Sequence, residues 1–402
     1  MKKVLFVISY LGKGGAERAL SNITTHFPAD WDIDILINED RGSDYPFRGK
    51  ILTLGFTEKP KMDSIIFQFK VFLRRILKLR RLKKEGNYQA CISFLDSANI
   101  ANILSGKRYC KVIVSVRNSL VQSAKTPQYK YIVNPLVKIL YNWSDNVIAV
   151  SDGVRWELIE HFNLKEKKVI AIENGYDLKS IGRQAELCLD KDIAELLSKY
   201  KTVITTGRLA DQKGHWHLIR AFSDVIKQVP DALLVIMGTG KLEAYLKELV
   251  VKCGLEDKVI FTGHVSNPYQ YEKYGDIFVL SSLYEGFPNA LAEAVCLGMP
   301  CIATDFRTGA REILAPDMDA QGEGVRKVTE VGYGVITPLC SGKKYSSLEE
   351  PLEYQERCLA DAMTMLLTNE EKKREYIDKS KQRRNDLTID AVVKKWVDLI
   401  SC

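Results

Sequence analysis

Short runs of apolar residues alternate with longer segments of helical periodicity along most of this chain. Such alternation favours parallel β-sheets covered by helices. In the first half the predicted strands are 4–9, 34–37, 51–54, 90–94, 112–116, 147–150 and 169–172. In the second half they are 202–206, 233–237, 259–262, 277–280 and 301–304, each separated from the next by a helix-length segment.

The alternation is interrupted at Asn174-Gly175-Tyr176-Asp177 and in the polar stretch that follows it. A chain of 402 residues is also too long for a single hydrophobic core. We therefore predict an α/β fold of two facing, Rossmann-like doubly wound domains, with ligands bound in an inter-domain cleft at the carboxyl ends of the strands. The predicted parts are an N-terminal domain 1–177, a linker region 178–200, a C-terminal domain 201–387 and a final helix 388–402.

The composition, 46% apolar and 27% charged, is that of a globular protein. No apolar run approaches the roughly 18 residues that a membrane-spanning helix needs. The start Met1-Lys2-Lys3 precedes a short apolar run without a small-residue cleavage site, which predicts a first strand and not a signal peptide. Nine cysteines, odd in number and without a C-x-x-C pair, favour reduced thiols in the cytoplasm over disulfides or a zinc site.

The net charge of +7 is unevenly distributed. Eight basic residues and no acidic residue lie between Lys70 and Lys84, and apolar residues recur there at helical spacing. This predicts a basic amphipathic helix suited to an anionic membrane, and hence a peripheral location on the inner face of the cytoplasmic membrane. The alternative is a core-packed helix with a solvated basic face. We expect no nucleic-acid partner, because no aromatic stacking pattern accompanies the charge.

Candidate chemistry centres on Glu285 and Glu293, which bracket a predicted strand-to-helix turn. Asn289 is a suitable N-cap for the helix, and backbone N–H groups at a helix N-terminus can hold a phosphate. The two carboxylates can then bind hydroxyls, one set on a sugar and the other on a ribose. The alternative is a pair of solvated glutamates near a helix start.

Glycine-rich loops follow other predicted strands. The loop from Gly12 to Arg18 opens a helix, but it lacks the third glycine of G-x-G-x-x-G and is not a Walker loop. In the second half, Arg208 and Lys213 lie five residues apart on one loop, where they can reach a pyrophosphate from two directions.

Two further loops and two acidic pairs complete the candidates. Gly238-Thr239-Gly240 and Gly263-His264-Val265 can offer backbone groups to a nucleobase, although each is by itself also a plain turn. Asp32-Ile33-Asp34 and Asp317-Met318-Asp319 have the D-x-D spacing of metal-dependent transferases. We expect neither pair to bind metal, because the first lies in a strand pattern and the second in a polar loop.

Taken together, three motifs resemble the family-4 glycosyltransferases of the GT-B fold. They are Gly14-Gly15-Ala16-Glu17-Arg18, then Gly207-Arg208-Leu209 with Gln212-Lys213-Gly214, and finally Glu285-Gly286-Phe287-Pro288-Asn289 through Glu293. Ala149-Val150-Ser151-Asp152-Gly153-Val154, Glu173-Asn174-Gly175 and Gly332-Tyr333-Gly334 extend the likeness over nearly the whole chain.

The resemblance implies roles for these residues. Arg208 and Lys213 would neutralise the donor's pyrophosphate, Glu285 would face hydroxyls of the transferred sugar, and Glu293 would hold the ribose. The implied catalytic residues are Glu285, Arg208 and Lys213. The implied donor-binding residues are Gly14, Gly15, Arg208, Lys213, Gly238, Gly263, His264, Val265, Glu285, Gly286, Phe287, Pro288, Asn289, Ala290, Leu291 and Glu293.

The resemblance also implies an N-terminal domain on the acceptor side, a donor-binding C-terminal domain and a last helix that crosses back to the first domain. Family members are retaining enzymes that require no metal or cofactor. Many carry a histidine where this chain has Arg117 and Asn118, a variant similar to transferases that extend lipid-linked bacterial glycans with N-acetylhexosamines. Either residue is a candidate contact for a sugar or a phosphate.

We therefore expect a retaining glycosyltransferase that moves a hexose or N-acetylhexosamine from a nucleotide sugar to a glycan on a polyprenyl diphosphate. UDP is the expected nucleotide, and the product would belong to a bacterial surface polysaccharide or protein glycan. Two alternatives remain. One is a nucleotide-sugar 2-epimerase of the same fold, and the other is a non-catalytic, membrane-docked assembly scaffold.

Overall fold

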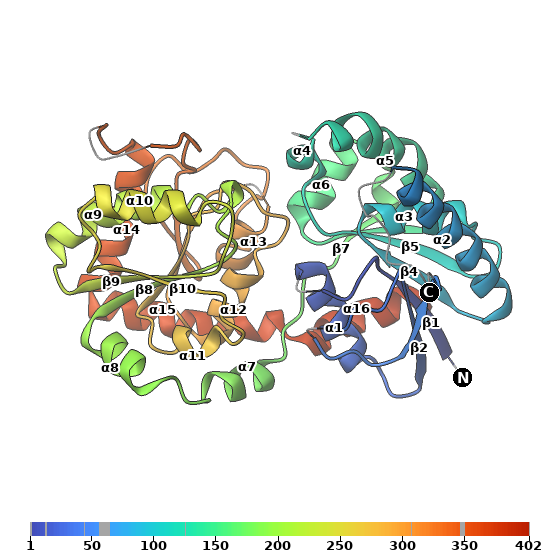
Figure 1. The fold of residues 1–402 in the computed structure, drawn as a ribbon, viewed down its shortest axis with the longest axis horizontal. Coiled ribbons are helices and arrows are strands. Elements are labelled where there is room, and N and C mark those ends of the chain that lie inside the picture. The colour runs from blue at the N-terminus through green and yellow to red at the C-terminus, as the bar shows by residue number, and fades with distance from the viewer. Residues whose placement is uncertain are drawn as a thin grey trace. The chain divides into compact units, whose positions relative to one another are not determined.

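The computed structural model describes residues 2–12, 14–43, 45–55, 65–124, 126–306, 308–345 and 350–401. The chain forms two compact units (Figure 1). Unit 1 comprises Met1–Gly175 and Ile389–Cys402, and unit 2 comprises Tyr176–Thr388. Lys13 of the predicted glycine-rich loop lies outside the described residues.

Unit 1 is built on a parallel sheet of seven strands in the order β3-β2-β1-β4-β5-β6-β7. Because β1 lies between β2 and β4, the strand order reverses beside it, which is where open α/β sheets usually bind ligands. The strands are β1 (Lys2–Val7), β2 (Trp31–Ile37), β3 (Lys50–Thr53), β4 (Ala90–Phe94), β5 (Lys111–Val116), β6 (Asn146–Ala149) and β7 (Val169–Ala171).

Helices cover both faces of this sheet. Buried residues of α1 and α16 form one core cluster with the sheet, and those of α2 and α3 form a second. The helical elements of unit 1 are α1 (Gly15–His26), α2 (Ile65–Glu85), α3 (Asp96–Leu104), α4 (Leu120–Ser123), η1 (Tyr129–Val133), α5 (Asn134–Leu140), η2 (Tyr141–Trp143), α6 (Asp152–Glu160), η3 (Glu166–Lys168) and α16 (Ile389–Ser401).

The last helix, α16, is part of unit 1 although almost the whole of unit 2 precedes it in the sequence. Trp396 is fully buried and stacks on Phe94, with 6.1 Å between the ring centroids. Lys111 Nζ donates a hydrogen bond to the Leu399 carbonyl at 2.8 Å. Apolar contact therefore fixes α16 against the sheet of unit 1, beside α1 (Figure 1).

Unit 2 repeats the architecture with a sheet in the order β10-β9-β8-β11-β12-β14-β13. All neighbours are parallel except β13 and β14, which form a hairpin around Gly332 and Tyr333. The strands are β8 (Lys201–Thr206), β9 (Ala232–Met237), β10 (Val259–Gly263), β11 (Ile277–Leu280), β12 (Cys301–Thr304), β13 (Thr329–Val331) and β14 (Gly334–Thr337). The predicted α/β class with two parallel sheets is confirmed, whereas the β13–β14 hairpin was not predicted.

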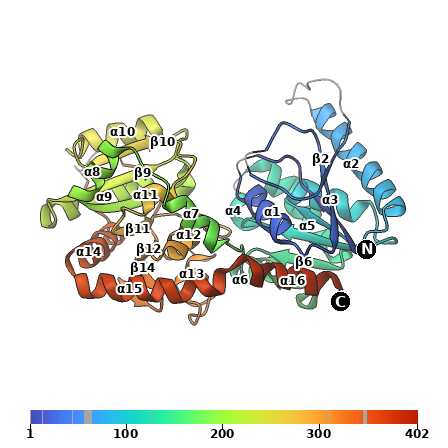
Figure 2. The ribbon, with the colours of Figure 1, turned by 90° about the horizontal axis from the view of Figure 1, so that it is seen from below.

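In unit 2 a core cluster lies between the sheet and helices that include α9 and α14, which pack on each other (Figure 2). Residues 178–200, treated above as a linker, form α7 and α8. The helical elements are α7 (Leu178–Ala185), α8 (Lys191–Lys199), η4 (Asp211–Lys213), α9 (His215–Gln228), α10 (Glu243–Lys252), α11 (Tyr269–Glu272), α12 (Asn289–Leu297), α13 (Ala310–Leu314), α14 (Tyr354–Thr368), α15 (Glu370–Arg383) and η5 (Arg384–Leu387).

Helix α2 has the predicted basic amphipathic sequence, but its burial differs from the prediction in part. Leu79 faces the core, whereas Phe69 and Leu73 are exposed. Conversely, Arg75 and Lys83 are buried, so they do not belong to the exposed basic face. Among the described residues no helix combines the length and the apolar character needed to cross a bilayer.

We predict that Trp396→Ala destabilises unit 1 by about 3–5 kcal/mol, because it leaves a cavity between α16 and the sheet. Urea denaturation followed by far-UV circular dichroism measures this. Lys394→Ala, an exposed change on the same helix, is the matched control and should leave stability nearly unchanged. Equal stability of the two variants would show that α16 does not stabilise unit 1.

Candidate active site

The strand-to-helix turn after β11 is largely buried. Glu285 and Phe287 are 8% and 7% exposed, and the neighbouring Gly286 and Pro288 are also buried. Helix α12 begins at Asn289 with Pro288 as the N-cap, so the prediction of Asn289 as the N-cap was wrong by one residue. The Asn289 side chain instead accepts a hydrogen bond from the Tyr176 hydroxyl at 2.7 Å. The helix ends at Leu297, and its C-cap is Gly298, which has a φ of 85°.

Both oxygens of the Glu285 carboxylate are held. Lys213 Nζ lies 2.6 Å from Oε1, and the Ser282 hydroxyl donates to the same oxygen at 2.8 Å. Gln212 Nε2 donates to Oε2 at 2.8 Å. The side chains of Lys213 and Glu285 are only 14% and 9% exposed, so water screens this ion pair weakly.

Backbone contacts join the two loops that carry this ion pair. The Leu283 N–H donates to the Gln212 carbonyl at 2.8 Å, and the Ser281 hydroxyl donates to the Lys213 carbonyl at 3.0 Å. Gly214 has a φ of 58°, and a Cβ there would lie 2.5 Å from the Ser281 carbonyl oxygen. A glycine is therefore required at position 214 for the close approach of the loops.

Charged and buried groups fix the short helix η4 that presents Lys213. Asp211 forms ion pairs with Lys241 and Lys344, whose hydrogen bonds lower the pKa of Asp211 to about 2. His215, the first residue of α9, is 2% exposed. Burial, with a smaller contribution from Lys213, lowers the pKa of His215 to about 3, so its imidazole is neutral at pH 7. The positive charge beside Glu285 therefore comes from Lys213 and not from His215.

Three glycines at the carboxyl ends of β8, β9 and β10 bring the strand ends together. The Gly207 N–H donates to the Met237 carbonyl at 2.9 Å, and the Gly238 N–H donates to the Gly263 carbonyl at 2.8 Å. A Cβ on Gly238, which has a φ of 143°, would lie 2.0 Å from the Gly207 carbonyl oxygen. His264 and Val265 follow on the same edge, with His264 exposed and Val265 half-buried.

The predicted catalytic residues are only partly gathered. Lys213 and Glu285 are in contact, whereas Arg208 is exposed and no described residue forms an ion pair with it. Glu293 is 3% exposed in the second turn of α12, beyond Leu291, which is fully buried. Ala290 is half-buried at the start of that helix.

Four of the predicted site residues belong to unit 1. Gly14 is the N-cap of α1 and Gly15 is its first residue, in the loop that was predicted to open a helix. Arg117 donates to the Asn174 side-chain oxygen and to Ser115 Oγ, the latter at 3.4 Å. Asn118 Nδ2 donates to Ser123 Oγ at 3.0 Å. These contacts hold Arg117 and Asn118 against unit 1.

Three further contacts of Glu285, from Gln212, Ser282 and Thr308, were not predicted from the sequence. The Thr308 hydroxyl donates to the Glu285 carbonyl, while the other two bind the carboxylate. For Ser282 the sequence contained one indication, because Ser281 and Ser282 are polar residues that directly follow the buried strand β11. Position 308 lies far along the sequence, and no local pattern connects it with Glu285.

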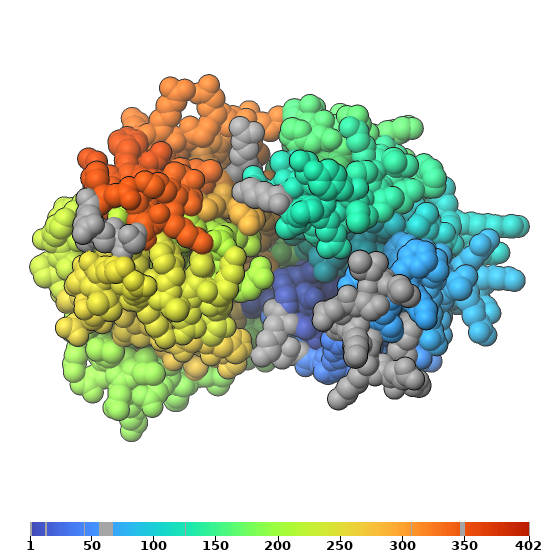
Figure 3. All heavy atoms as spheres, turned by 45° about the horizontal axis from the view of Figure 1, so that its top comes forward, coloured from blue at the N-terminus to red at the C-terminus, as the bar shows by residue number. Residues whose placement is uncertain are grey.

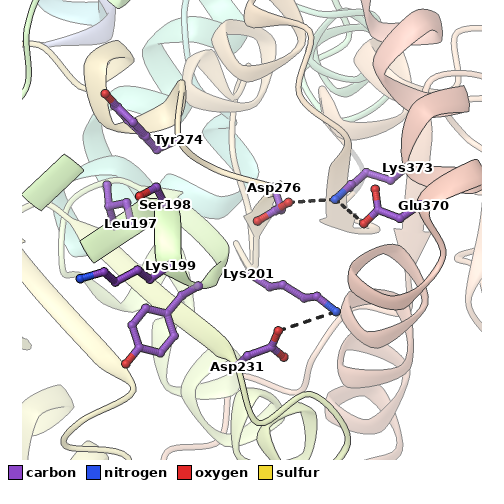
Figure 4. A pocket seen from close by; sticks show the side chains of 10 residues that line it. Leu197, Ser198, Lys199, Lys201, Asp231, Tyr274, Asp276, Glu370 and Lys373 are labelled. Atoms are coloured by element: carbon purple, nitrogen blue, oxygen red, sulfur yellow. Dashed lines mark hydrogen bonds and ion pairs between the residues drawn. The ribbon is translucent and has the colours of Figure 1, made fainter. Parts of the chain in front are cut away.

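A hollow of ≈ 360 Å³ lies elsewhere in unit 2, at the amino ends of β8, β9 and β11 (Figure 4). Several of its charged residues pair with one another, as in the Lys373–Asp276 contact of 2.9 Å. Because ligands of α/β sheets bind at the opposite, carboxyl edge, we do not assign the active site to this hollow. Among the described residues no group of three His, Cys, Asp or Glu side chains is arranged to hold a metal ion.

Comparison with known proteins identifies the family. The family model Glycosyltransferase Family 4 matches residues 13–180, and Glycosyl transferases group 1 matches residues 190–323. An uncharacterized glycosyltransferase of Methanocaldococcus jannaschii is 31% identical over 355 residues, 86% of each chain. The chain is a family-4 glycosyltransferase of the GT-B fold. The resemblance inferred from the sequence motifs is thereby confirmed, and the family favours transfer over the epimerase and scaffold alternatives.

Two further proteins are similar to this glycosyltransferase. One is the N-acetylgalactosamine-N,N'-diacetylbacillosaminyl-diphospho-undecaprenol 4-alpha-N-acetylgalactosaminyltransferase of Campylobacter jejuni, 27% identical over 328 residues, which are 79% of this chain and 84% of the relative. The other is Anabaena HepE, solved in complex with UDP-glucose. It matches with a TM-score of 0.73 and 17% identity, over 100% of both chains, and this likeness shows the shared fold.

In this glycosyltransferase, the absence of a side chain at Gly207 leaves space for the Lys213 side chain to reach Glu285. A Cβ on Gly207 would lie 2.9 Å from Lys213 Cε. We predict that Gly207→Ala folds normally, because Lys213 can move aside, but lowers kcat by about tenfold or more since the ammonium is misplaced. Thermal unfolding and initial-rate kinetics test this. Gly182→Ala, on α7 with open space around the glycine, is the control, and full activity of Gly207→Ala would contradict the prediction.

Proposed function

We propose that this glycosyltransferase is a retaining enzyme that moves a hexose or an N-acetylhexosamine from a UDP-sugar to a glycan carried by a polyprenyl diphosphate. The product would be an intermediate of a bacterial surface polysaccharide or protein glycan. The part of this proposal that concerns the nucleotide-sugar donor rests on one observation. It is the weakly screened ion pair between Lys213 and Glu285, beside the start of α12. Such a site combines a cation for a diphosphate with a carboxylate for sugar hydroxyls.

In the proposed mechanism the donor's diphosphate takes over the Lys213 ammonium. Gln212 and Ser282 continue to hold the Glu285 carboxylate, which is then available to sugar hydroxyls. Arg208, exposed on the same loop, supplies a second cation, and backbone N–H groups at the start of α12 supply further donors. In this proposal Glu293 holds the ribose.

These cations act on the bond that breaks. As the bond between sugar C1 and the diphosphate oxygen lengthens, negative charge grows on the diphosphate, so fixed cations stabilise the transition state more than the ground state. The acceptor hydroxyl then bonds to C1 on the same face of a short-lived oxocarbenium-like ion. Its proton passes to the departing diphosphate, and the configuration at C1 is retained.

Two similarities support the substrates. Anabaena HepE has the same fold and was solved with UDP-glucose, which supports UDP as the nucleotide. The Campylobacter jejuni relative is named for transfer to a sugar on diphospho-undecaprenol, which supports an acceptor carried by a polyprenyl diphosphate. In this proposal unit 1 binds the acceptor, with Arg117 and Asn118 as candidate contacts, and unit 2 binds the donor.

The surface of α2 supports a membrane-bound acceptor. Phe69, Leu73 and Leu77 are 59%, 44% and 68% exposed and follow one another at four-residue spacing, so they form one apolar stripe on the helix. Exposed basic residues flank the stripe, namely Lys70, Arg74, Arg80, Arg81 and Lys84. Figure 3 shows α2, in light blue, at the surface of unit 1. This combination is typical of helices that lie in the interface of an anionic membrane.

We predict that Glu285→Gln lowers kcat for transfer from UDP-sugars by about 100-fold or more, because the neutral amide cannot replace the carboxylate. The assay uses labelled UDP-sugars and a bacterial lipid extract, with the product identified by mass. Glu248→Gln, which breaks the exposed Glu248–Lys252 pair, is the matched control. Wild-type protein that neither binds nor turns over any UDP-sugar would overturn the donor proposal.

For the membrane, we predict that Arg74→Glu with Arg81→Glu weakens binding to anionic liposomes on the order of tenfold or more, since each basic residue near the surface contributes about 1 kcal/mol. Leu73→Ser with Leu77→Ser should also weaken it. Liposome co-sedimentation measures both effects.

The control for the liposome experiment reverses two lysines of α10, Lys247 and Lys252, which pair with glutamates of their own helix in unit 2. Equal loss in this control would mean that binding follows net charge and that α2 is not the contact surface. Unchanged binding of both α2 variants would contradict the proposal directly.

A further inference from the structure

Arg75 is a buried arginine on the inner side of α2. Arg75 is 3% exposed, and its guanidinium donates hydrogen bonds to three neutral side chains. Nε and Nη2 donate to Asn38 Oδ1 at 3.2 and 2.6 Å. Nη1 donates to Ser97 Oγ at 2.9 Å, and Nη2 donates to Ser9 Oγ at 3.3 Å.

No described carboxylate balances this charge. Within the described residues, the hydrogen-bond acceptors of the Arg75 guanidinium are one amide oxygen and two hydroxyl oxygens. Burial lowers the pKa of Arg75 to about 10, which leaves it charged at neutral pH. A buried charge without an opposite partner is strongly unfavourable. An anion beside Arg75 would remove this imbalance.

A second buried cation on the same helix has a structural explanation that Arg75 lacks. Lys83 Nζ donates to the carbonyls of Asn102 and Gly106 and to Ser105 Oγ, all within 2.9 Å. These groups lie at the end of α3, where the carbonyls and the helix dipole present negative partial charge. Lys83 is thus compensated by the protein itself.

The partners of Arg75 lie at the ligand-binding edge of the unit 1 sheet. Ser9 and Asn38 follow β1 and β2, and Ser97 lies in the first turn of α3, directly after β4. Since β1 is flanked by β2 and β4, this position is the point where the strand order reverses. Crevices at such points are the usual ligand sites of doubly wound sheets.

Two hydroxyl groups lie between the Arg75 guanidinium and the protein surface, and Arg75 polarises both of them. Ser9 Oγ and Ser97 Oγ each accept a hydrogen bond from the guanidinium, so the hydrogen of each hydroxyl is directed to another acceptor. Ser97 is exposed and Ser9 is half-buried. Hydroxyls polarised by a cation are strong hydrogen-bond donors, which suits an anion with several oxygen atoms.

We propose that Ser9, Ser97 and Arg75 form an anion site of unit 1 that binds a phosphate or diphosphate group. The proposal rests on the proposed function where it names the source of that group, the diphosphate of the lipid-linked acceptor. A free phosphorylated compound has the same chemistry and is distinguished in the experiment. Helix α2 then serves the membrane with its outer surface and the anion with its inner one.

The test titrates the full chain with inorganic pyrophosphate by calorimetry, in the presence of saturating UDP to occupy unit 2. Arg75→Met should weaken binding by about tenfold or more, because charge-assisted hydrogen bonds are lost. Ser97→Ala removes only an exposed hydroxyl, so it preserves the fold and should weaken binding severalfold. Lys83→Met, the other buried cation of α2, is the matched control and should retain wild-type affinity.

Three results would overturn the proposal. The first is that the wild type does not bind pyrophosphate. The second is that Ser97→Ala, and Arg75→Met if it folds, bind pyrophosphate with wild-type affinity. The third is that Lys83→Met loses as much pyrophosphate affinity as Arg75→Met or Ser97→Ala. Circular dichroism establishes which variants fold. If Arg75→Met does not fold, Ser97→Ala decides the outcome.

Geranyl diphosphate and geraniol identify the source of the phosphate. Tighter binding of geranyl diphosphate than of pyrophosphate, with no binding of geraniol, supports the lipid-linked acceptor. Equal binding of the two diphosphates supports a free phosphorylated compound in the same site. UDP binding by the wild type tests the proposed function separately. A wild type that binds pyrophosphate but does not bind UDP would contradict the donor proposal alone.

Discussion

The proposed active site of this glycosyltransferase is built on one ion pair held between two loops, that of Lys213 and Glu285. Removal of either partner would leave a poorly solvated charge behind, and this explains why so much of unit 2 is arranged around the pair. Gly214 allows the two loops to approach, Gly207 leaves room for the Lys213 side chain, and Ser282 and Gln212 donate to the Glu285 carboxylate. In the mechanism proposed above, this cation and this anion stay in contact until the donor's diphosphate separates them.

The fold was largely predictable from the sequence, because buried parallel strands appear as short apolar runs. The twelve predicted runs correspond to β1 through β12. The β13–β14 hairpin escaped prediction because it is short and partly exposed, and its strands carry no apolar run comparable to the others. The start of α12 was misplaced by one residue, since Asn289 binds Tyr176 and does not cap the helix.

The site was less predictable than the fold. Motif spacing placed Lys213 and Glu285 on loops of one sheet, but their direct contact depends on how β8 and β11 lie next to each other. In α2 the periodicity identified the helix, whereas the burial of Arg75 depends on Asn38, a residue from another strand end. The pattern along the chain predicts the helices and strands and the sheet edge at which each loop lies. Tertiary contacts decide which charged side chains meet.

The position of Tyr176 has a consequence for observing ligand binding. It is the first residue of unit 2, its N–H donates to the Leu387 carbonyl at 2.9 Å, and its hydroxyl lies on Asn289 at the start of α12. A ligand that draws the Asn289 amide toward itself therefore weakens the anchor of the segment by which the chain enters unit 2. Deuterium uptake at the Tyr176 amide would then report occupancy of a site to which that amide contributes nothing.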